Sequence, residues 1–201
     1  MNELKKRIDG GMAIEDIGAW LDGLDHDARW ANVQVLGKSE QSKLYSLAAG
    51  RLTPLSHYVP DTIAPGTPVR HLGRNTLPVF TRFEKRFMRA PGQDDLLWGY
   101  NHGATMGLTG PGYFVVREPG SSSPDGRSDF GEQNFINYYE VPAEQPPAGW
   151  PPLRDNTGLV GNLVYGQMCD YMWRVSEHVS VGEAFKKGSS IQSWFVLCRL
   201  P

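Results

Sequence analysis

Apolar and polar residues alternate along much of the chain after residue 69, and this period of two constrains the fold more than any other feature. The clearest case runs from Val179 to Cys198, where two alternating segments flank a turn at Gly188-Ser189. Successive side chains of a β-strand point to opposite faces, so the pattern predicts a hairpin of two antiparallel strands.

The segment over residues 79–88 alternates in the same way and predicts another strand. Its two faces carry different side chains. One face has Val79, Thr81, Phe83, Lys85 and Phe87, and the other has Phe80, Arg82, Glu84, Arg86 and Met88.

Residues 69–201 contain about seven or eight such segments, separated by turns such as Pro91-Gly92. A meander of strands leaves two open edges, and closure into a barrel removes them. We therefore predict the α+β class, with a short N-terminal helical segment followed by a mainly antiparallel β-barrel or a strongly curved sheet. Residues 163–177 suit a strand face and also a helix, and we favour the strand.

The first 50 residues follow a helical period instead. Apolar residues from Ile14 to Leu24 fall on one stripe of a helix. Asp25 is a suitable N-cap for a second helix, and Ser39 can begin a third that ends at Gly50.

Prolines and glycine interrupt the next segment, 51–68, so it cannot be one continuous helix. We interpret it as a connector that lies over the surface of the barrel. The predicted organisation is a helical segment at 1–50, a Pro-rich connector at 51–68 and a barrel domain at 69–201.

Composition restricts the partners and the location. Charge is nearly balanced, with 20 Lys+Arg against 22 Asp+Glu, which does not favour nucleic acid. No secretory signal and no run of ~18 apolar residues is visible, so we expect no membrane insertion. Only Cys169 and Cys198 are present, which predicts two buried thiols rather than a disulfide scaffold and makes the cytoplasm the expected location.

Several enzyme motifs are missing from the sequence. It has no GxGxxG, GxxxxGK[ST], HExxH or GxSxG, and no Cys/His spacing typical of zinc sites. We therefore expect no cofactor and no metal, and favour a binding protein over an enzyme.

Basic residues cluster between residues 70 and 89. Arg82 and Arg86 are predicted to share a strand face, and inside a barrel their guanidinium groups could hold a carboxylate or phosphate head group. Glu84 lies between them on that face and could instead pair with both, which would leave a solvated outer face.

A glycine-rich segment surrounds Tyr100-Asn101-His102. His102 could act as a general acid or base near neutral pH. If the protein is an enzyme, His102, Tyr100 and Glu84 are the candidate catalytic residues. The alternative is a glycine-rich bend with an exposed histidine.

Charged residues also gather near the C-terminus. Asp170, Arg174 and His178 share one face of the predicted strand, with Glu177 beside them. Inside a barrel such groups are either ligand contacts or a structural lock. The candidate ligand-binding residues, including one of the tyrosines that could line a pocket, are Arg82, Arg86, Tyr138, Asp170, Arg174 and His178.

The stretch LVYGQMCDYMWRVSEHVSVGEAFKKG and the later SWFVLCRL resemble the last strands of small bacterial lipocalin-like, or calycin-type, proteins. The resemblance covers about forty residues, and the Gly-x-Trp of the first lipocalin strand is not evident. It implies a lipocalin-like barrel with an internal cavity and brings no catalytic residues. The matching positions are Asp170, Arg174, Val175, Val181, Gly182, Phe195, Leu197 and Arg199.

These observations predict a binding protein whose barrel takes a small, mostly apolar ligand, with or without an anionic head group. One alternative is a cofactor-independent acid–base enzyme, such as an isomerase, cyclase or lyase, on the same barrel. The other is an interaction module, in which the helices and the Pro-rich segment 142–152 contact a partner or form a homodimer.

Overall fold

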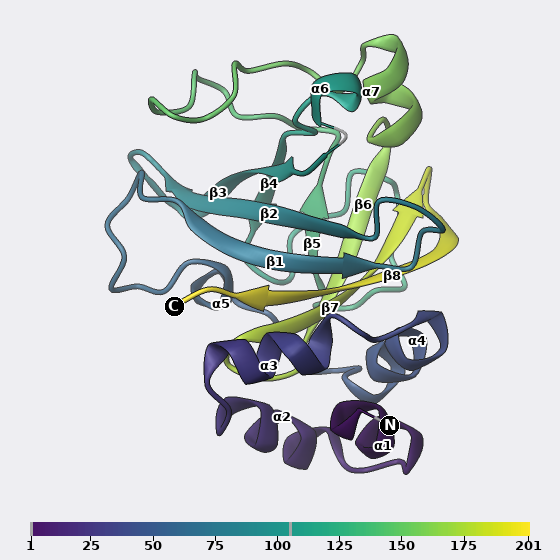
Figure 1. Cartoon of the computed structure of the whole chain (residues 1–201). Helices are drawn as coiled ribbons and strands as arrows, with labels where there is room; N and C mark the ends of the chain where they lie inside the picture. Colours follow the sequence, from purple (N-terminus) through teal and green to yellow (C-terminus); the bar gives the residue numbers. More distant parts are fainter. Residues whose placement is uncertain (1, 105) are drawn as a thin grey trace.

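Eight antiparallel strands close into a barrel in the computed structural model, which describes residues 2–104 and 106–201 (Figure 1). The strands are β1 (Val69–Asn75), β2 (Arg82–Ala90), β3 (Gln93–His102), β4 (Phe114–Arg117), β5 (Asn134–Asn137), β6 (Met168–Arg174), β7 (Val179–Lys186) and β8 (Ser189–Arg199). Each strand pairs with the next, and β1 pairs with β8 to close the wall. The predicted class, a helical segment followed by an antiparallel barrel, is confirmed.

Two tight turns set the register of neighbouring strands. Pro91-Gly92 joins β2 to β3, and Gly92 has a positive φ of 71°, as the third position of a type II turn requires. Lys187-Gly188 joins β7 to β8 with φ values of 52° and 74°. Positive φ at both positions is the hairpin geometry that matches strand twist, and it falls one residue before the predicted turn.

Helices α1 (Glu3–Asp9), α2 (Ile14–Asp22), α3 (His26–Val33) and α4 (Lys38–Leu47) precede the barrel. Asp25 is the N-cap of α3, as predicted, and its Oδ1 accepts a hydrogen bond from the Ala28 N–H (2.8 Å). The N-cap of α4 is Gly37 rather than the predicted Ser39. Glu40 explains this start, because its carboxylate accepts the Gly37 N–H (2.9 Å).

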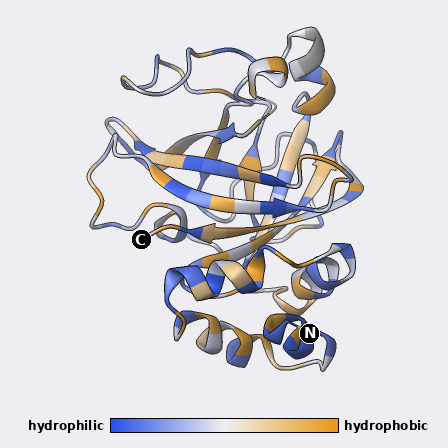
Figure 2. Cartoon of the chain, viewed as in Figure 1, coloured by the Kyte–Doolittle hydropathy of each residue, from blue (hydrophilic) through white to orange (hydrophobic). Residues whose placement is uncertain are grey.

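The apolar sides of these helices cover the outer wall of β7 and β8. Ile17 and Leu21 of α2 and Leu44 of α4 share one buried cluster with Val181 and Val196 of the strands. Figure 2 shows apolar residues interleaved with polar ones along both the helices and the strands. The helices are short, so this packing rather than their own propensity holds them in place.

The segment predicted as a surface connector closes one end of the barrel instead. It contains the short helix α5 (Leu55–Tyr58), and the side chains of Leu55, Tyr58 and Val59 are fully buried in the barrel core. The Tyr58 ring stacks on Phe87, with 4.9 Å between ring centroids. The prediction of a surface position was wrong for residues 55–59, whose apolar side chains plug the barrel, whereas residues 60–68 are exposed or half-buried.

The interior is packed at the α5 end and open at the other. Beyond the plug, apolar side chains fill the barrel: Phe87, Leu97, Phe114, Val116, Ile136, Met172 and Leu197. Helices α6 (Met106–Thr109) and α7 (Leu159–Val164) lie next to each other above the open end (Figure 1).

Residues 163–177, for which a strand and a helix were both considered, contain part of each. Residues 163–164 end α7, and β6 occupies residues 168–174. Cys169 and Cys198 are buried and free, as predicted. They lie on β6 and β8, with β7 between them.

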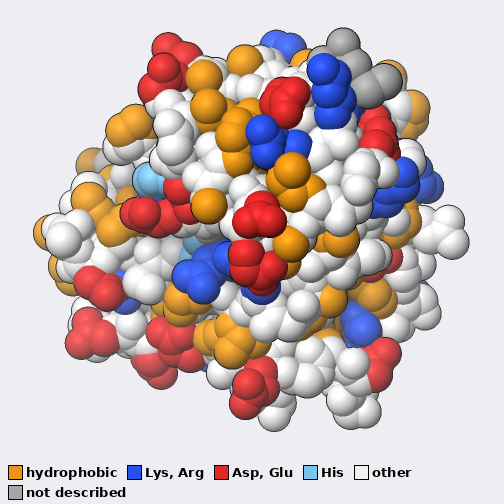
Figure 3. Space-filling view, turned by 90° about the horizontal axis from the view of Figure 1, so that it is seen from below, with side chains coloured by type: hydrophobic (Ala, Val, Ile, Leu, Met, Phe, Trp, Pro, Cys, Tyr) orange, Lys and Arg blue, Asp and Glu red, His pale blue; other side chains and the backbone are white. Residues whose placement is uncertain are grey.

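Seen from the side of the helices, Lys and Arg are interspersed with Asp, Glu and apolar side chains (Figure 3). No helix among the described residues is long and apolar enough to cross a membrane.

Candidate functional site

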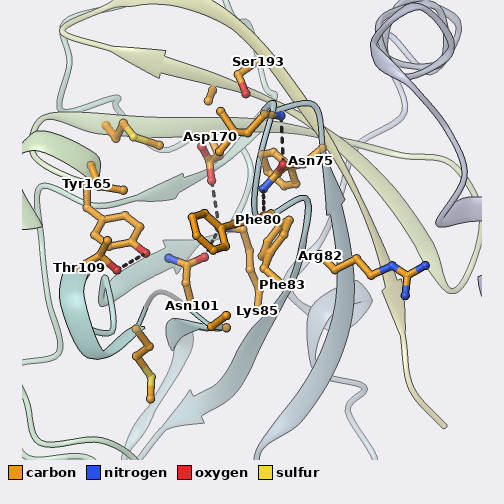
Figure 4. Close-up of a pocket in the computed structure, with 18 of the residues that line it drawn as sticks. Asn75, Phe80, Arg82, Phe83, Lys85, Asn101, Thr109, Tyr165, Asp170 and Ser193 are labelled. Carbon is orange, nitrogen blue, oxygen red and sulfur yellow. Dashed lines mark hydrogen bonds and ion pairs between the residues drawn. The ribbon is translucent and has the colours of Figure 1, made fainter.

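The open half of the barrel contains a cavity of about 600 Å³. Its walls are mostly apolar. Asn101 and Asp170 lie close together in Figure 4, whereas Thr109 lies beside Tyr165 at another part of the wall. The main wall residues are Phe83, Tyr165, Met168, Ala184, Ser193 and Phe195, and the polar ones at the inner end are Lys85, Asn101, Tyr138 and Asp170.

A buried ion pair forms the floor of this cavity. Lys85 Nζ lies 3.1 Å from Asp170 Oδ2, and each side chain is only 3% exposed. Lys85 also donates to Asn101 Oδ1 (2.9 Å) and to the hydroxyl oxygen of Tyr138. Tyr138 donates in turn to Asp170 Oδ2 (3.1 Å). The three N–H groups of the ammonium therefore all have acceptors, and they hold the lysine in one position.

Strand geometry brings these groups together. Lys85 on β2 and Asn101 on β3 are direct cross-strand partners. Asp170 reaches the same level from β6, on the far wall of the barrel. Aromatic rings surround the ammonium, with Nζ 5.0 Å from the ring centroid of Phe114 and 5.2 Å from that of Phe195. These ring faces favour a cation at this depth.

Burial perturbs the acid–base properties of the floor. Loss of solvation lowers the pKa of Lys85, although Asp170 opposes the shift, and it raises the pKa of Asp170, which Lys85 opposes in the same way. Burial, followed by the charge of Asp170, raises the pKa of Tyr138 well above its usual value. Asp170 Oδ1 is buried with no hydrogen-bond partner among the described residues. The floor therefore has an unused acceptor.

Exposed apolar side chains surround the mouth of the cavity. Phe80 is 63% exposed and Leu108 is 75% exposed. Apolar patches of this kind mark binding grooves more often than ordinary surface. The exposed apolar residues that also line the cavity are Leu77, Val79, Phe80, Leu108, Val164 and Ile191.

Phe80 has a positive φ of 53°, which is strained for a bulky side chain. Replacing it with glycine should raise the free energy of unfolding by about 1 kcal/mol, because glycine adopts this φ without strain. The same change removes a ring from the mouth, so an apolar dye that enters the cavity should bind the variant more weakly. Urea denaturation and dye titration measure the two effects.

Val79→Gly is the matched control in the same loop, since Val79 is also exposed and has no positive φ. It should give no gain in stability. A loss of stability in Phe80→Gly equal to that of Val79→Gly would show that φ strain at Phe80 is unimportant.

The arginine pair predicted to hold an anionic head group does not meet in the cavity. Arg86 lies on the outer face of β2, where its Nε is 3.1 Å from Glu84 Oε2. Arg82 touches the rim, but its guanidinium points away from the cavity (Figure 4). Arg70 also pairs with Glu84 (2.6 Å). Glu84 therefore pairs with Arg86, as the alternative for this face predicted, but its second partner is Arg70, and among the described residues no hydrogen bond or ion pair joins it to Arg82.

The candidate catalytic residues lie on the outer wall. Tyr100 packs against Trp150, with 4.8 Å between ring centroids, and Arg86 donates to its hydroxyl (3.1 Å). Glu84 and His102 are cross-strand partners on the same face, and His102 reaches the cavity rim. Within the described part of the chain, no hydrogen bond joins these three side chains.

The C-terminal candidates are divided between the two ends of the barrel. Asp170 and Tyr138 belong to the cavity floor. Arg174 is exposed at the other end of β6 and lines a second, smaller cavity beside α5. His178 lies in the turn before β7, where Arg199 approaches its Nδ1 (3.3 Å).

Lys85 was not among the candidate residues chosen from the sequence, and Asn101 was named only as part of the segment Tyr100-Asn101-His102, although both line the cavity floor. The signal for Lys85 was present. It is the one charged residue on a predicted strand face between Phe83 and Phe87, and such a face points into a barrel.

No group of three His, Cys, Asp or Glu side chains that could hold a metal ion occurs in the described ranges. A scan against protein-family models and searches of curated proteins and of solved structures found no match to this chain. The lipocalin-like relationship therefore stays a prediction.

Proposed function

We propose that the barrel binds a small, mostly apolar molecule with a neutral head group that donates a hydrogen bond. The observation that carries this proposal is the cavity of about 600 Å³, which has mostly apolar walls and a hydrogen-bonded group of polar side chains at its floor. Ligand sites of proteins typically enclose ~300–1,000 Å³ and place a few polar groups in an apolar lining.

The ion pair supports a neutral head group. Lys85 and Asp170 compensate each other at 3.1 Å. A carboxylate at the floor would be repelled by Asp170, and an ammonium would be repelled by Lys85. The unpartnered Asp170 Oδ1 instead favours an alcohol, a phenol or an amide N–H, because an unmet buried acceptor is costly. An anionic head held by Arg86 has no support, since that side chain lies outside.

Filling the cavity tests the proposal directly. Ser193 lines the wall from β8, and Ser193→Phe should occupy ligand space. Native mass spectrometry of protein purified from cells should show a bound small molecule, and the variant should lose it. A neutral dye that fluoresces in apolar surroundings should bind the variant at least tenfold more weakly.

Glu144→Phe is the control, because Glu144 is exposed in a loop and lines neither cavity. It should bind the dye as the parent does. Parent protein that carries no ligand and binds no dye would contradict the proposal. A ligand recovered in chemically altered form after incubation would favour the acid–base enzyme alternative.

A further inference from the structure

A second cavity, of about 220 Å³, lies at the plugged end of the barrel, and we propose that it binds a small oxyanion. The apolar layer that contains Phe87, Met172 and Leu197 fills the barrel core. β6 runs from Asp170 in the first cavity to Arg174 in the second. The second site is therefore separate from the proposed ligand cavity. It is lined by Pro54, Ser56, His57, Pro60, Asp61, Arg174, Glu177 and Arg199.

Two arginines supply the positive charge. Arg199 is 7% exposed, and its Nη1 donates to the His57 carbonyl oxygen (2.6 Å). Its position is therefore fixed before any ligand arrives. Arg174 is exposed, and its guanidinium makes no hydrogen bond or ion pair with the described residues. A guanidinium fork matches a carboxylate or a phosphate, so a fixed and a free arginine together form a suitable clamp.

His57 adds a buried polar group to the same lining, and the Nε2–H tautomer of its neutral ring would offer a donor to an anion. Its side chain is 5% exposed, and its Nε2 is buried without a partner in the part of the chain that the structure describes. Burial and the positive charges around it, including Arg199 and Arg174, keep its pKa well below the usual value. The two guanidinium groups thus bring positive charge to this end of the barrel beside a neutral histidine, and a bound anion would compensate that charge.

The two carboxylates in the lining do not cancel this charge. Asp61 is already paired with Arg89. Glu177 Oε1 lies 3.8 Å from Arg199 Nη2, but its side chain is 71% exposed. An exposed carboxylate on a turn is weakly held, because surface ion pairs contribute little. Glu177 therefore acts as a competitor that an oxyanion has to displace.

Charge variants test the site by NMR. Phosphate and acetate are titrated separately at constant ionic strength, with chloride as the balancing anion, while the arginine Nε–Hε signals are followed. At least one of the two anions should shift the Arg174 and Arg199 signals to saturation. Arg174→Gln should weaken that binding about tenfold, and Glu177→Gln should strengthen it about fivefold, because a like charge is removed.

Arg154→Gln is the control, since Arg154 is exposed and does not line the cavity, so it changes net charge equally. It should leave the affinity unchanged. Arg174 lies at an exposed strand end, so its variant should fold, and the gain expected in Glu177→Gln does not depend on a loss. Absence of saturable shifts with both anions, or equal losses in the two arginine variants, would overturn the proposal.

Discussion

Replacing Lys85 with methionine should lower the free energy of unfolding by about 3–5 kcal/mol. The ammonium is the counter-ion of a carboxylate whose side chain is only 3% exposed. Without it, Asp170 stays in the barrel core as an uncompensated buried charge or must take up a proton at neutral pH. Methionine preserves most of the apolar stem, so lost packing contributes little. Urea denaturation followed by tryptophan fluorescence measures the change.

A double variant separates the charge effect from the effect of volume. Asp170→Leu alone should also destabilise, because it leaves Lys85 unpaired. The combination Lys85→Met with Asp170→Leu removes both charges and should be more stable than either single variant. A loss below about 1 kcal/mol in Lys85→Met, or additive losses in the double variant, would show that the pair is not coupled in this way.

Alternation predicted the barrel wall because each inward residue has to be apolar or paired. Phe83, Lys85 and Phe87 share a face in the sequence, and in the structure they point to the interior. The same alternation puts Arg86 on the opposite face of the strand, which is the outer one in the structure. Its possible role inside a barrel depended on which face turned inward, and alternation alone does not distinguish the faces.

The polar floor could not be derived in the same way. Lys85 and Asp170 are far apart in sequence and meet only because β2 and β6 face each other across the closed barrel. Asp170 and Arg174 share a strand, yet they serve opposite ends of the barrel. Two residues on the same face of a strand therefore need not belong to the same site.

The sequence contains a helical signal for the plug, which the neighbouring prolines obscured. Leu55, Tyr58 and Val59 have the i, i+3, i+4 spacing of one helical face. The flanking prolines argue against a long helix but permit one turn, since proline suits the start of a helix. Pro54 is the N-cap of α5. The prolines therefore limit the helix to one turn without preventing its apolar face from entering the barrel.

Acid should destabilise the plugged end of the barrel through His71. This residue is fully buried, and its Nε2 is 2.9 Å from the Tyr58 carbonyl oxygen. A carbonyl only accepts, so Nε2 must carry the hydrogen and Nδ1 is the unprotonated nitrogen. Nδ1 is buried with no partner among the described residues. Protonation would thus create a charged N–H group with nothing to receive it.

Burial lowers the pKa of His71 to about 3, against the opposing hydrogen bond to Tyr58. The unfolded chain, with a histidine pKa near ~6.5, therefore binds the proton at pH values where the folded chain does not, and stability must fall as the pH falls through that interval. Between pH 7.5 and 4.5 the contribution of His71 amounts to about 3 kcal/mol. Urea denaturation at both pH values measures it.

His71→Gln isolates this contribution, because glutamine keeps an N–H donor for Tyr58 and does not titrate. His57, whose pKa is also held well below its usual value, acts in the same direction, and Asp170, whose pKa is raised, acts in the other. Both are present in parent and variant, so the difference between the two proteins cancels them to first order. The variant should lose about 3 kcal/mol less than the parent on acidification. Equal losses would mean that His71 takes up its proton as readily in the folded barrel as in the unfolded chain. A group on the plug would then have to accept a hydrogen bond from the protonated Nδ1.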